Sequence, residues 1–212
     1  MKVAVVDYGL SNLKSIKNVL DYLDITYEFV TEYKEAQEYT HIILPGVGSF
    51  KNGMIGLKKS RLDEFIKDTA ERKMPILGIC LGMQLLLTKS YEFGETDGLD
   101  LIPGEVKGFN IDINNGLYLN KVPHIGWNTL TKTNLEWRGS ILDGLSDYSM
   151  YFVHSFYCKV TSIEHQLAAT SYIGIDFASV IKRDNIFGCQ FHPEKSGKCG
   201  IQIIKQFLKG QN

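Results

Sequence analysis

A cysteine between two glycines lies where a short apolar stretch meets a helical pattern. Residues 76–79 have the length and composition of a buried strand, and apolar residues over 81–87 indicate the start of a helix. Cys80 is therefore predicted at the bend of a strand-turn-helix unit, flanked by Gly78 and Gly82 in a Gly-x-Cys-x-Gly pattern, the cysteine counterpart of a nucleophile elbow. The N-terminus of a helix favours the thiolate, which is the attacking form of cysteine. The alternative for these five residues alone is a buried cysteine without chemistry.

A cysteine nucleophile needs a base, and the tripeptide His192-Pro193-Glu194 offers one beside a carboxylate. Because Pro193 lacks an N–H, the tripeptide is excluded from a helix interior and is predicted to be extended. Side chains two positions apart on an extended chain point to the same side, so Glu194 can orient the ring of His192. The alternative is a histidine that only ends a strand. With the elbow upstream, we predict Cys80 as nucleophile, His192 as base and Glu194 as the orienting acid.

The four other histidines compete with His192 for the role of base. His154 lies inside an aromatic stretch at 151–157, where a partly buried and hydrogen-bonded imidazole is expected. His124 is predicted in a loop that also carries an exposed aromatic residue. His41 and His165 have no supporting neighbours. We assign all four to structural or binding roles.

The developing oxyanion needs backbone donors near the nucleophile. The N–H of Leu81, which follows the cysteine, is one candidate, and the peptides of Val47 and Gly48 in a glycine-bearing turn provide the second. A Gly-x-Gly turn after a strand can also cradle a phosphate. The residues at 49–51 give neither a third glycine nor the Gly-Lys-Ser/Thr of a P-loop, so a nucleotide site is disfavoured.

The composition is that of an ordinary globular protein, with 212 residues, 44% hydrophobic and 11% aromatic residues, and a net charge of -1. One domain over residues 1–212 is expected. The near-neutral charge argues against nucleic acid as a partner. The four cysteines form no C-x-x-C pair and the chain opens without a signal-peptide pattern, which favours a cytoplasmic protein with reduced thiols. No stretch is long enough to cross a membrane, and neither a metal nor a cofactor is predicted.

Apolar strands alternate with helical patterns through the first part of the chain. This alternation predicts a parallel sheet with helices on both faces and ligands at the carboxyl ends of its strands. Beyond about residue 90, glycine-punctuated short stretches predict antiparallel strands instead. The expected strands cover residues 3–6, 26–30, 41–44, 76–79, 105–109, 150–158, 177–182 and 186–191, and a long helix is expected over 54–72.

Four motifs together resemble those of class I glutamine amidotransferases. They are Pro-Gly-Val-Gly at 45–48, Gly-Ile-Cys-Leu-Gly-Met-Gln at 78–84, Tyr-Phe-Val-His-Ser-Phe at 151–156 and Gln-Phe-His-Pro-Glu-Lys-Ser at 190–196. The resemblance implies a flavodoxin-like α/β fold, with a central, mostly parallel sheet, helices on both faces and additional antiparallel strands. It also implies a Cys80, His192 and Glu194 triad that hydrolyses L-glutamine.

The resemblance further implies which residues contact the glutamine substrate. Gln84 matches a position one helical turn beyond the nucleophile, and Glu92 matches the carboxylate that holds the substrate ammonium group. Backbone groups of Gly48, Ser155 and Phe156 match further substrate contacts. The alternative for Gln84 and Glu92 is ordinary solvation of a helix.

Within the family, residues 7–13 and 123–128 resemble those of the glutaminase subunits of imidazole glycerol phosphate synthase in histidine biosynthesis. This implies that the chain forms a heterodimer with a separate (β/α)8-barrel cyclase subunit, and that ammonia passes directly between them. The face that carries Trp127 and Lys195 would bind the barrel. The Gly-Val-Gly turn at 46–48 is expected to be misoriented without that partner.

Two alternatives remain open at this point. One is a paralogous glutaminase subunit that supplies ammonia for amidination of a surface-polysaccharide sugar. Three residues that depart from the pattern expected of the histidine-pathway subunits are consistent with it. These are Ser11, Asp100 and Cys189. A regulatory binding module with an inactive triad is the non-enzyme alternative.

Overall fold

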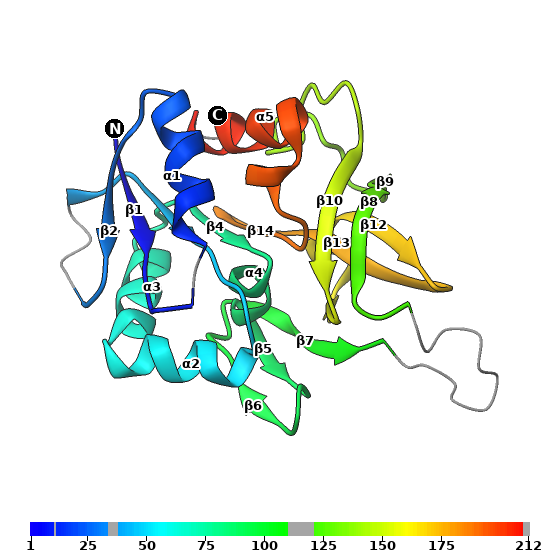
Figure 1. Ribbon diagram of the computed structural model, residues 1–212, viewed down its shortest axis with the longest axis horizontal. Helices are drawn as coiled ribbons and strands as arrows, with labels where there is room; N and C mark the ends of the chain where they lie inside the picture. Colours follow the sequence, from blue (N-terminus) through cyan, green and yellow to red (C-terminus); the bar gives the residue numbers. More distant parts are fainter. Residues whose placement is uncertain (11, 34–37, 110–120, 210–212) are drawn as a thin grey trace.

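The computed structural model describes residues 1–10, 12–33, 38–109 and 121–209 of the chain. Within them, the main sheet has the strand order β2-β1-β3-β4-β14-β13-β11-β7-β5-β6, with β12 paired to β13 and β9 paired to β12 (Figure 1). A separate ribbon pairs β8 with β10. The predicted α/β architecture, a largely parallel central sheet with added antiparallel strands, is confirmed.

The first half of the sheet is parallel. Its strands are β1 (Lys2–Val6), β2 (Thr26–Val30), β3 (His41–Leu44), β4 (Ile76–Ile79) and β14 (Ile186–Cys189). Every residue of β3, β4 and β14 is buried. Uninterrupted apolar stretches of this kind suit strands that are covered on both faces.

Helices cover both faces of this parallel half. Figure 1 shows α1 (Leu13–Tyr22) and α5 (Gly197–Leu208) on one side, and α2 (Phe50–Lys59) and α3 (Leu62–Glu71) on the other. Residues alternate along β1 between the two layers. Val3 and Val5 belong to the core that includes α1 and α5, whereas Ala4 and Val6 belong to the core that includes α2 and α3.

The second half is mostly antiparallel. Its described strands are β5 (Leu87–Ser90), β6 (Thr96–Asp97), β7 (Ile102–Gly108), β9 (Thr131–Lys132), β11 (Phe156–Val160), β12 (Gln166–Tyr172) and β13 (Ile175–Arg183). Among these strands, only β5 and β7 pair in parallel. The ribbon consists of β8 (His124–Thr129) and β10 (Ser149–His154), and short 3-10 turns lie at Ile163–His165 and Pro193–Lys195.

The single helix predicted over residues 54–72 is wrong, because the chain forms α2 and α3 with a break at Ser60 and Arg61. Arg61 has a φ of 53°, and the carbonyl of Ser60 accepts the N–H of Tyr33. Leu57 and Leu62 are both fully buried. At about 100° per residue, positions five apart face different sides of one straight helix, so burying both requires the break.

Two other predicted elements end earlier than expected, because the residues that follow pair with a different strand. The stretch at 150–158 changes direction at Ser155, since β10 pairs with β8 whereas β11 pairs with β7. The helix expected over 81–87 ends earlier as α4 (Leu81–Leu85), and Leu87 instead begins β5. Pairing with β7 has overridden the local helical pattern.

Two of the three departures from the family pattern can be located. Asp100 accepts a hydrogen bond from Thr88 at 2.6 Å, and Cys189 is buried in β14. Ser11 lies outside the described residues. No helix among the described residues has the length and apolarity required to span a bilayer.

Candidate active site

Cys80 occupies a strained bend between β4 and α4. Its φ of 54° and ψ of -108° are unusual for a residue with a side chain. The flanking glycines permit the bend, because a Cβ on Gly82 would lie 1.7 Å from the Leu44 carbonyl oxygen and one on Gly78 would lie 2.7 Å from that of Gly82. The geometry is that of an elbow, which holds its central side chain away from the strand.

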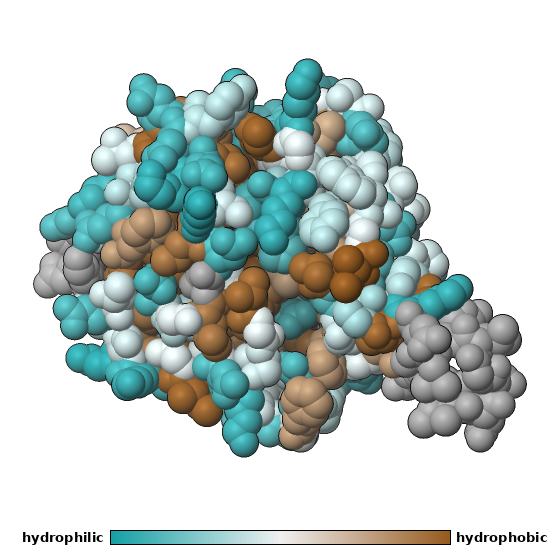
Figure 2. All heavy atoms as spheres, in the orientation of Figure 1, coloured by the Kyte–Doolittle hydropathy of each residue, from teal (hydrophilic) through white to brown (hydrophobic). Residues whose placement is uncertain are grey.

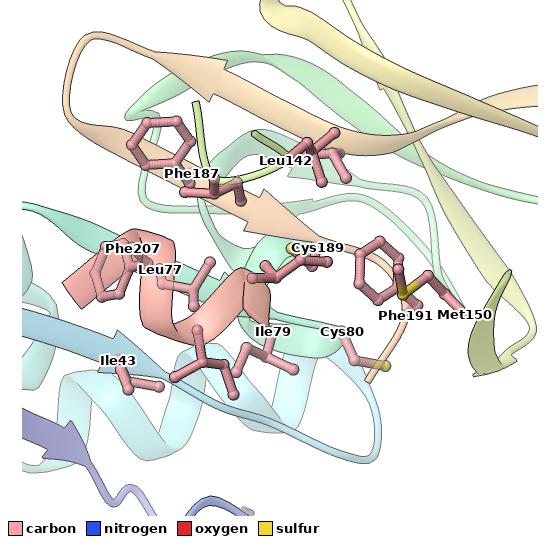
Figure 3. Packing of buried hydrophobic residues seen from close by; sticks show 14 of the residues in the cluster. Ile43, Leu77, Ile79, Cys80, Leu142, Met150, Phe187, Cys189, Phe191 and Phe207 are labelled. Atoms are coloured by element: carbon pink, nitrogen blue, oxygen red, sulfur yellow. The ribbon is translucent and has the colours of Figure 1, made fainter. Parts of the chain in front are cut away.

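The sulfur of Cys80 lies at the end of the apolar core. Figure 3 shows its side chain beyond Ile79, with the sulfur pointing away from that residue. It is 7% exposed, lies 3.8 Å from the Val153 carbonyl oxygen and lies 4.0 Å from Nε2 of Gln190. The sulfur therefore lies where the apolar core meets polar groups, and its contacts with two of them are weak.

His192 and Glu194 form a buried pair. Nδ1 of His192 donates to Oε1 of Glu194 over 2.7 Å, and both side chains are 2% exposed. The extended tripeptide predicted here is wrong, because Pro193–Lys195 forms a 3-10 turn. His192 alone is extended, and its N–H donates to the carbonyl of Tyr151. The 3-10 turn therefore brings the Glu194 carboxylate to Nδ1 of His192. The two side chains do not meet through the alternation of an extended chain.

The environment of His192 favours its charged form. Burial alone would lower the pKa of the imidazole, but interactions with the Cys80 sulfur and the Glu194 carboxylate outweigh burial and raise this pKa to about 10. Among the described residues, no N or O atom lies in hydrogen-bonding geometry to Nε2 of His192. Because Glu194 occupies Nδ1, Nε2 is the nitrogen left to interact with the Cys80 sulfur and to exchange a proton.

A pocket of about 420 Å³ surrounds the sulfur, a volume typical of small-molecule sites. It brings together residues from six separate segments of the chain. Its lining consists of Val47, Gly48, Cys80, Leu81, Gln84, Glu92, Phe93, Pro123, Val153, His154, Ser155, Phe156 and His192. The structure thus gathers around one pocket every residue predicted for the oxyanion and glutamine contacts, with Glu194 behind His192.

The two predicted oxyanion donors differ in orientation. Leu81 is the first residue of α4, so its N–H has no acceptor within the helix. The N–H of Val47 instead donates to the carbonyl of Leu10 over 2.8 Å. Gly48, which follows, has a φ of 100° that glycine adopts without strain. In this arrangement Val47 does not offer its N–H to the pocket.

Gln84 and Glu92 are buried and held by backbone groups. Nε2 of Gln84 donates to the Phe156 carbonyl at 3.0 Å and to Oε1 of Gln190 at 3.2 Å. Oε2 of Glu92 accepts the N–H of Phe50 at 2.5 Å. Burial raises the pKa of the Glu92 carboxyl, and the Phe50 N–H partly opposes that rise. Simple solvation of a helix surface therefore does not describe either side chain.

Several contributors to the site were missed or misplaced from the sequence. Gln190 is fully buried between Gln84 and Cys80, and the exposed ring of Phe93 lines the mouth of the pocket. His124 was predicted in a loop, but it is a buried residue of β8 and bonds to His154. Residues 124–129 carry no clear strand signal in sequence, because the exposed positions of β8 hold the apolar Ile125 and Trp127 and a buried position holds His124.

The residues predicted at the partner surface lie outside the pocket. Trp127 is 59% exposed on β8 and packs edge-on against Tyr151, and Lys195 is exposed directly after Glu194. Figure 2 shows apolar atoms in a broken band across the middle of the face drawn there. The exposed large apolar side chains include Val47 and Phe93 from the pocket rim and Ile125 beside Trp127.

Across the described residues, no group of three or more His, Cys, Asp or Glu side chains is arranged to hold a metal ion. All four cysteines are free thiols.

Comparisons with known proteins identify the family of the chain. Residues 4–210 match the model of the family "Glutamine amidotransferase class-I". The chain is 45% identical over 210 residues to imidazole glycerol phosphate synthase subunit HisH 1 of Legionella pneumophila strain Paris, covering 98% of both chains. It is 43% identical over 206 residues to subunit HisH of Caldanaerobacter subterraneus, covering 97% of this chain and 96% of that one.

Solved structures support the fold alone. The PurLQS structure from Thermotoga maritima aligns with a TM-score of 0.73 at 19% identity, covering 98% of this chain and 97% of that one. A crystal structure described as glutamine amidotransferase gives a TM-score of 0.73 at 15% identity over the same shares of the two chains. Because the family match and the relatives span nearly the whole chain, it belongs to the class I glutamine amidotransferase family.

Proposed function

We propose that this chain, as one domain over residues 1–212, is the glutaminase subunit of an imidazole glycerol phosphate synthase. It hydrolyses L-glutamine to glutamate and ammonia, and the ammonia passes to a (β/α)8-barrel cyclase subunit for histidine biosynthesis. The observation that carries the proposal is the elbow cysteine in one pocket with the His192–Glu194 pair. The names of relatives at 43 to 45% identity support the pathway.

In the first step, the Cys80 thiolate attacks the carboxamide carbon of glutamine. The charged ring of His192 gives its Nε2 proton to the departing amine, so that ammonia leaves and a γ-glutamyl thioester remains. Glu194 holds Nδ1 at 2.7 Å and thereby directs Nε2 toward the reacting atoms. The raised pKa of His192 keeps this proton available at neutral pH.

In the second step, water hydrolyses the thioester. The ring of His192, now neutral after giving up its proton, accepts one from the attacking water. Glutamate leaves, and the sulfur and the imidazole return to their starting protonation states. Neither step consumes a cofactor.

Both steps develop negative charge on the former carboxamide oxygen. The Leu81 N–H can donate to this oxygen as the structure stands, whereas the Val47 N–H is occupied by Leu10. Full stabilisation requires the peptide between Gly46 and Val47 to turn, because one N–H cannot serve both acceptors. Removing one oxyanion donor typically costs roughly 100- to 1000-fold in kcat. We propose that docking of the barrel causes this rotation of the peptide.

Glutamine itself is held by its polar ends. The Glu92 carboxylate receives the substrate ammonium group, which would restore its negative charge against the effect of burial. The Gln84 amide and backbone groups of Gly48, Ser155 and Phe156 complete the contacts. This places the carboxamide at the sulfur.

A protonated ammonium ion is not a nucleophile, so ammonia has to reach the second active site without entering bulk water. This requirement explains why a glutaminase of this kind would work as a subunit. Trp127, on β8, provides an exposed aromatic ring for the barrel, and Lys195, directly after Glu194, provides an exposed cation.

The proposal is tested by combining the chain with the (β/α)8-barrel subunit of its own organism and assaying imidazole glycerol phosphate formation. Wild type is expected to support the reaction from glutamine and from ammonium salts. Cys80→Ala should abolish the glutamine-dependent reaction and leave the ammonia-dependent one intact. Cys199→Ala, which removes a thiol on α5, is the matched control and should behave as wild type.

Three results would contradict the proposal. Unchanged glutamine-dependent turnover in Cys80→Ala would exclude the thiol as nucleophile. Absence of glutamine-dependent turnover in wild type, with the ammonia-dependent reaction intact, would favour an inactive binding module. Formation of glutamate without imidazole glycerol phosphate would retain the glutaminase but favour the amidination paralogue, whose barrel acts on a sugar.

A further inference from the structure

Two buried histidines form part of a continuous chain of hydrogen bonds behind the pocket. Nδ1 of His154 lies 2.8 Å from the Phe156 carbonyl oxygen, and Nε2 of His154 lies 3.0 Å from Nδ1 of His124. Nε2 of His124 lies 3.3 Å from Nδ2 of Asn128. The chain therefore runs from β8 to the first residue of β11, and His154 also lines the pocket.

The direction of every bond in this chain is determined. The Phe156 carbonyl can only accept, so Nδ1 of His154 carries a proton and donates. Burial lowers the pKa of His154 to about 3 and that of His124 to about 4, so both rings are neutral and carry one proton each. Nε2 of His154 then accepts from Nδ1 of His124, and Nε2 of His124 accepts from Asn128.

The far end of the chain independently requires the same direction. Oδ1 of Asn128 accepts the N–H of Thr129 at 2.7 Å, and Nδ2 donates to the carbonyl of Ser171 at 3.1 Å. These two contacts fix the orientation of the Asn128 amide, so that its Nδ2 faces Nε2 of His124 and donates to it. Both ends therefore agree, and the two rings are satisfied without conflict.

Packing holds the His124 ring in place. It stacks between Tyr172, with ring centroids 3.9 Å apart, and Phe152, with centroids 4.8 Å apart. The two stacked contacts are within about 20° of parallel. The ring thus has a single orientation from which to donate to His154.

The same Phe156 carbonyl accepts a second hydrogen bond, from Nε2 of Gln84. The other hydrogen of that nitrogen goes to Gln190. In the part of the chain that the structure describes, both hydrogens of Nε2 are therefore committed, and Oε1 of Gln84 is left to accept from a bound molecule. Because Nε2 of Gln84 is bonded to the Phe156 carbonyl, the position of this carbonyl determines the direction in which Oε1 of Gln84 points.

We propose that His124 and His154 are positioning residues for glutamine binding, which hold the Phe156 carbonyl and, through it, the Gln84 amide in the orientation that receives the substrate. The proposal rests on the glutaminase function proposed above. Neither ring exchanges a proton with the substrate. Their effect is expected on binding of glutamine more than on the chemical step.

The test compares two substitutions of equal shape, His124→Asn and His124→Leu, in the complex with the barrel subunit. Both remove the aromatic stack, but only Asn can still donate to Nε2 of His154. His124→Leu should raise KM for glutamine roughly 10-fold with kcat changed less than about 3-fold, whereas His124→Asn should restore KM to within about 3-fold of wild type. Ammonia-dependent turnover should be unchanged in both variants.

A second measurement does not depend on activity. Nitrogen-15 NMR of the wild-type chain with labelled histidine should show both rings as neutral Nδ1–H tautomers at neutral pH. An Nε2–H tautomer at His154, or equal KM values in the two variants, would overturn the positioning role. Absence of glutamine turnover in the wild-type complex would instead overturn the glutaminase function, and with it this role.

Discussion

Nδ1 of His192 donates to Oε1 of Glu194 over 2.7 Å in a site where both side chains are 2% exposed. The pair is made locally, by a 3-10 turn, and it leaves Nε2 of the ring to interact with the elbow cysteine. Its main effect is electrostatic. Together with the cysteine, the carboxylate overcomes the cost of burying a charged imidazole.

The pair predicts the alkaline side of the glutaminase pH profile. Because the pKa of His192 is raised to about 10, activity should persist through neutral pH and fall as the pH rises through that value. Glu194→Gln removes the anion, so kcat should fall by roughly 100- to 10,000-fold and the alkaline limb should move to lower pH. Steady-state assays across pH measure both effects. Glu164→Gln, an exposed carboxylate, is the control, and an unmoved limb in Glu194→Gln would contradict this role.

The same pair should make folding stability depend on pH. The folded pKa of His192 lies above the unfolded value of about 6.5, so the contribution is complete below about pH 6.5 and is lost as the pH rises through about 10. The difference in free energy of unfolding between wild type and Glu194→Gln should therefore be largest near pH 6 and smaller near pH 10. Urea unfolding at both values measures it. A difference that grows with pH would contradict the assignment.

Gly82 is the most restricted of the elbow glycines. An added Cβ would lie 1.7 Å from the Leu44 carbonyl oxygen, so Gly82→Ala should lower the free energy of unfolding by about 3 kcal/mol and displace Cys80. Gly108→Ala is the control, since its Cβ would meet only ordinary contacts from 3.4 Å with the Phe156 ring. Thermal and urea unfolding compare the two. Equal stabilities would show that the close approach to Leu44 is not restrictive.

The hydrogen bond from Val47 to Leu10 predicts that the isolated chain is a poor glutaminase. Adding the barrel subunit should raise kcat by roughly 100-fold or more, the usual contribution of one oxyanion donor. Glutamate release, measured with and without the barrel, tests this directly. Equal rates in the two conditions would indicate that the second donor is not controlled by the partner.

Trp127 should be important for docking of the barrel. Its ring is 59% exposed, so Trp127→Ala should leave the fold intact while weakening the complex by roughly 30-fold, as expected for an aromatic anchor. Ile163, which is 63% exposed, provides the control Ile163→Ala. Titration of each variant with the barrel gives the dissociation constants. Wild-type affinity in Trp127→Ala would place the interface elsewhere.

The sequence by itself determined the features whose signals are local. Uninterrupted apolar stretches predicted the parallel strands, because strands covered on both faces cannot alternate with polar residues. Gly78 and Gly82 predicted the bend at Cys80, because only glycine allows such close backbone approach. Family motifs from distant positions named the residues expected to contact glutamine, and the structure brings those residues together along one pocket.

Only the tertiary structure decided features that depend on partners far along the chain. The break at Arg61 arises because Leu57 and Leu62 must both be buried, and the early end of α4 arises because Leu87 pairs with β7. The Val47 N–H found its acceptor at Leu10, and His124 became a buried strand residue against β10. Local patterns cannot specify these outcomes, since each backbone group and each apolar face is satisfied by a neighbour that folding alone brings near.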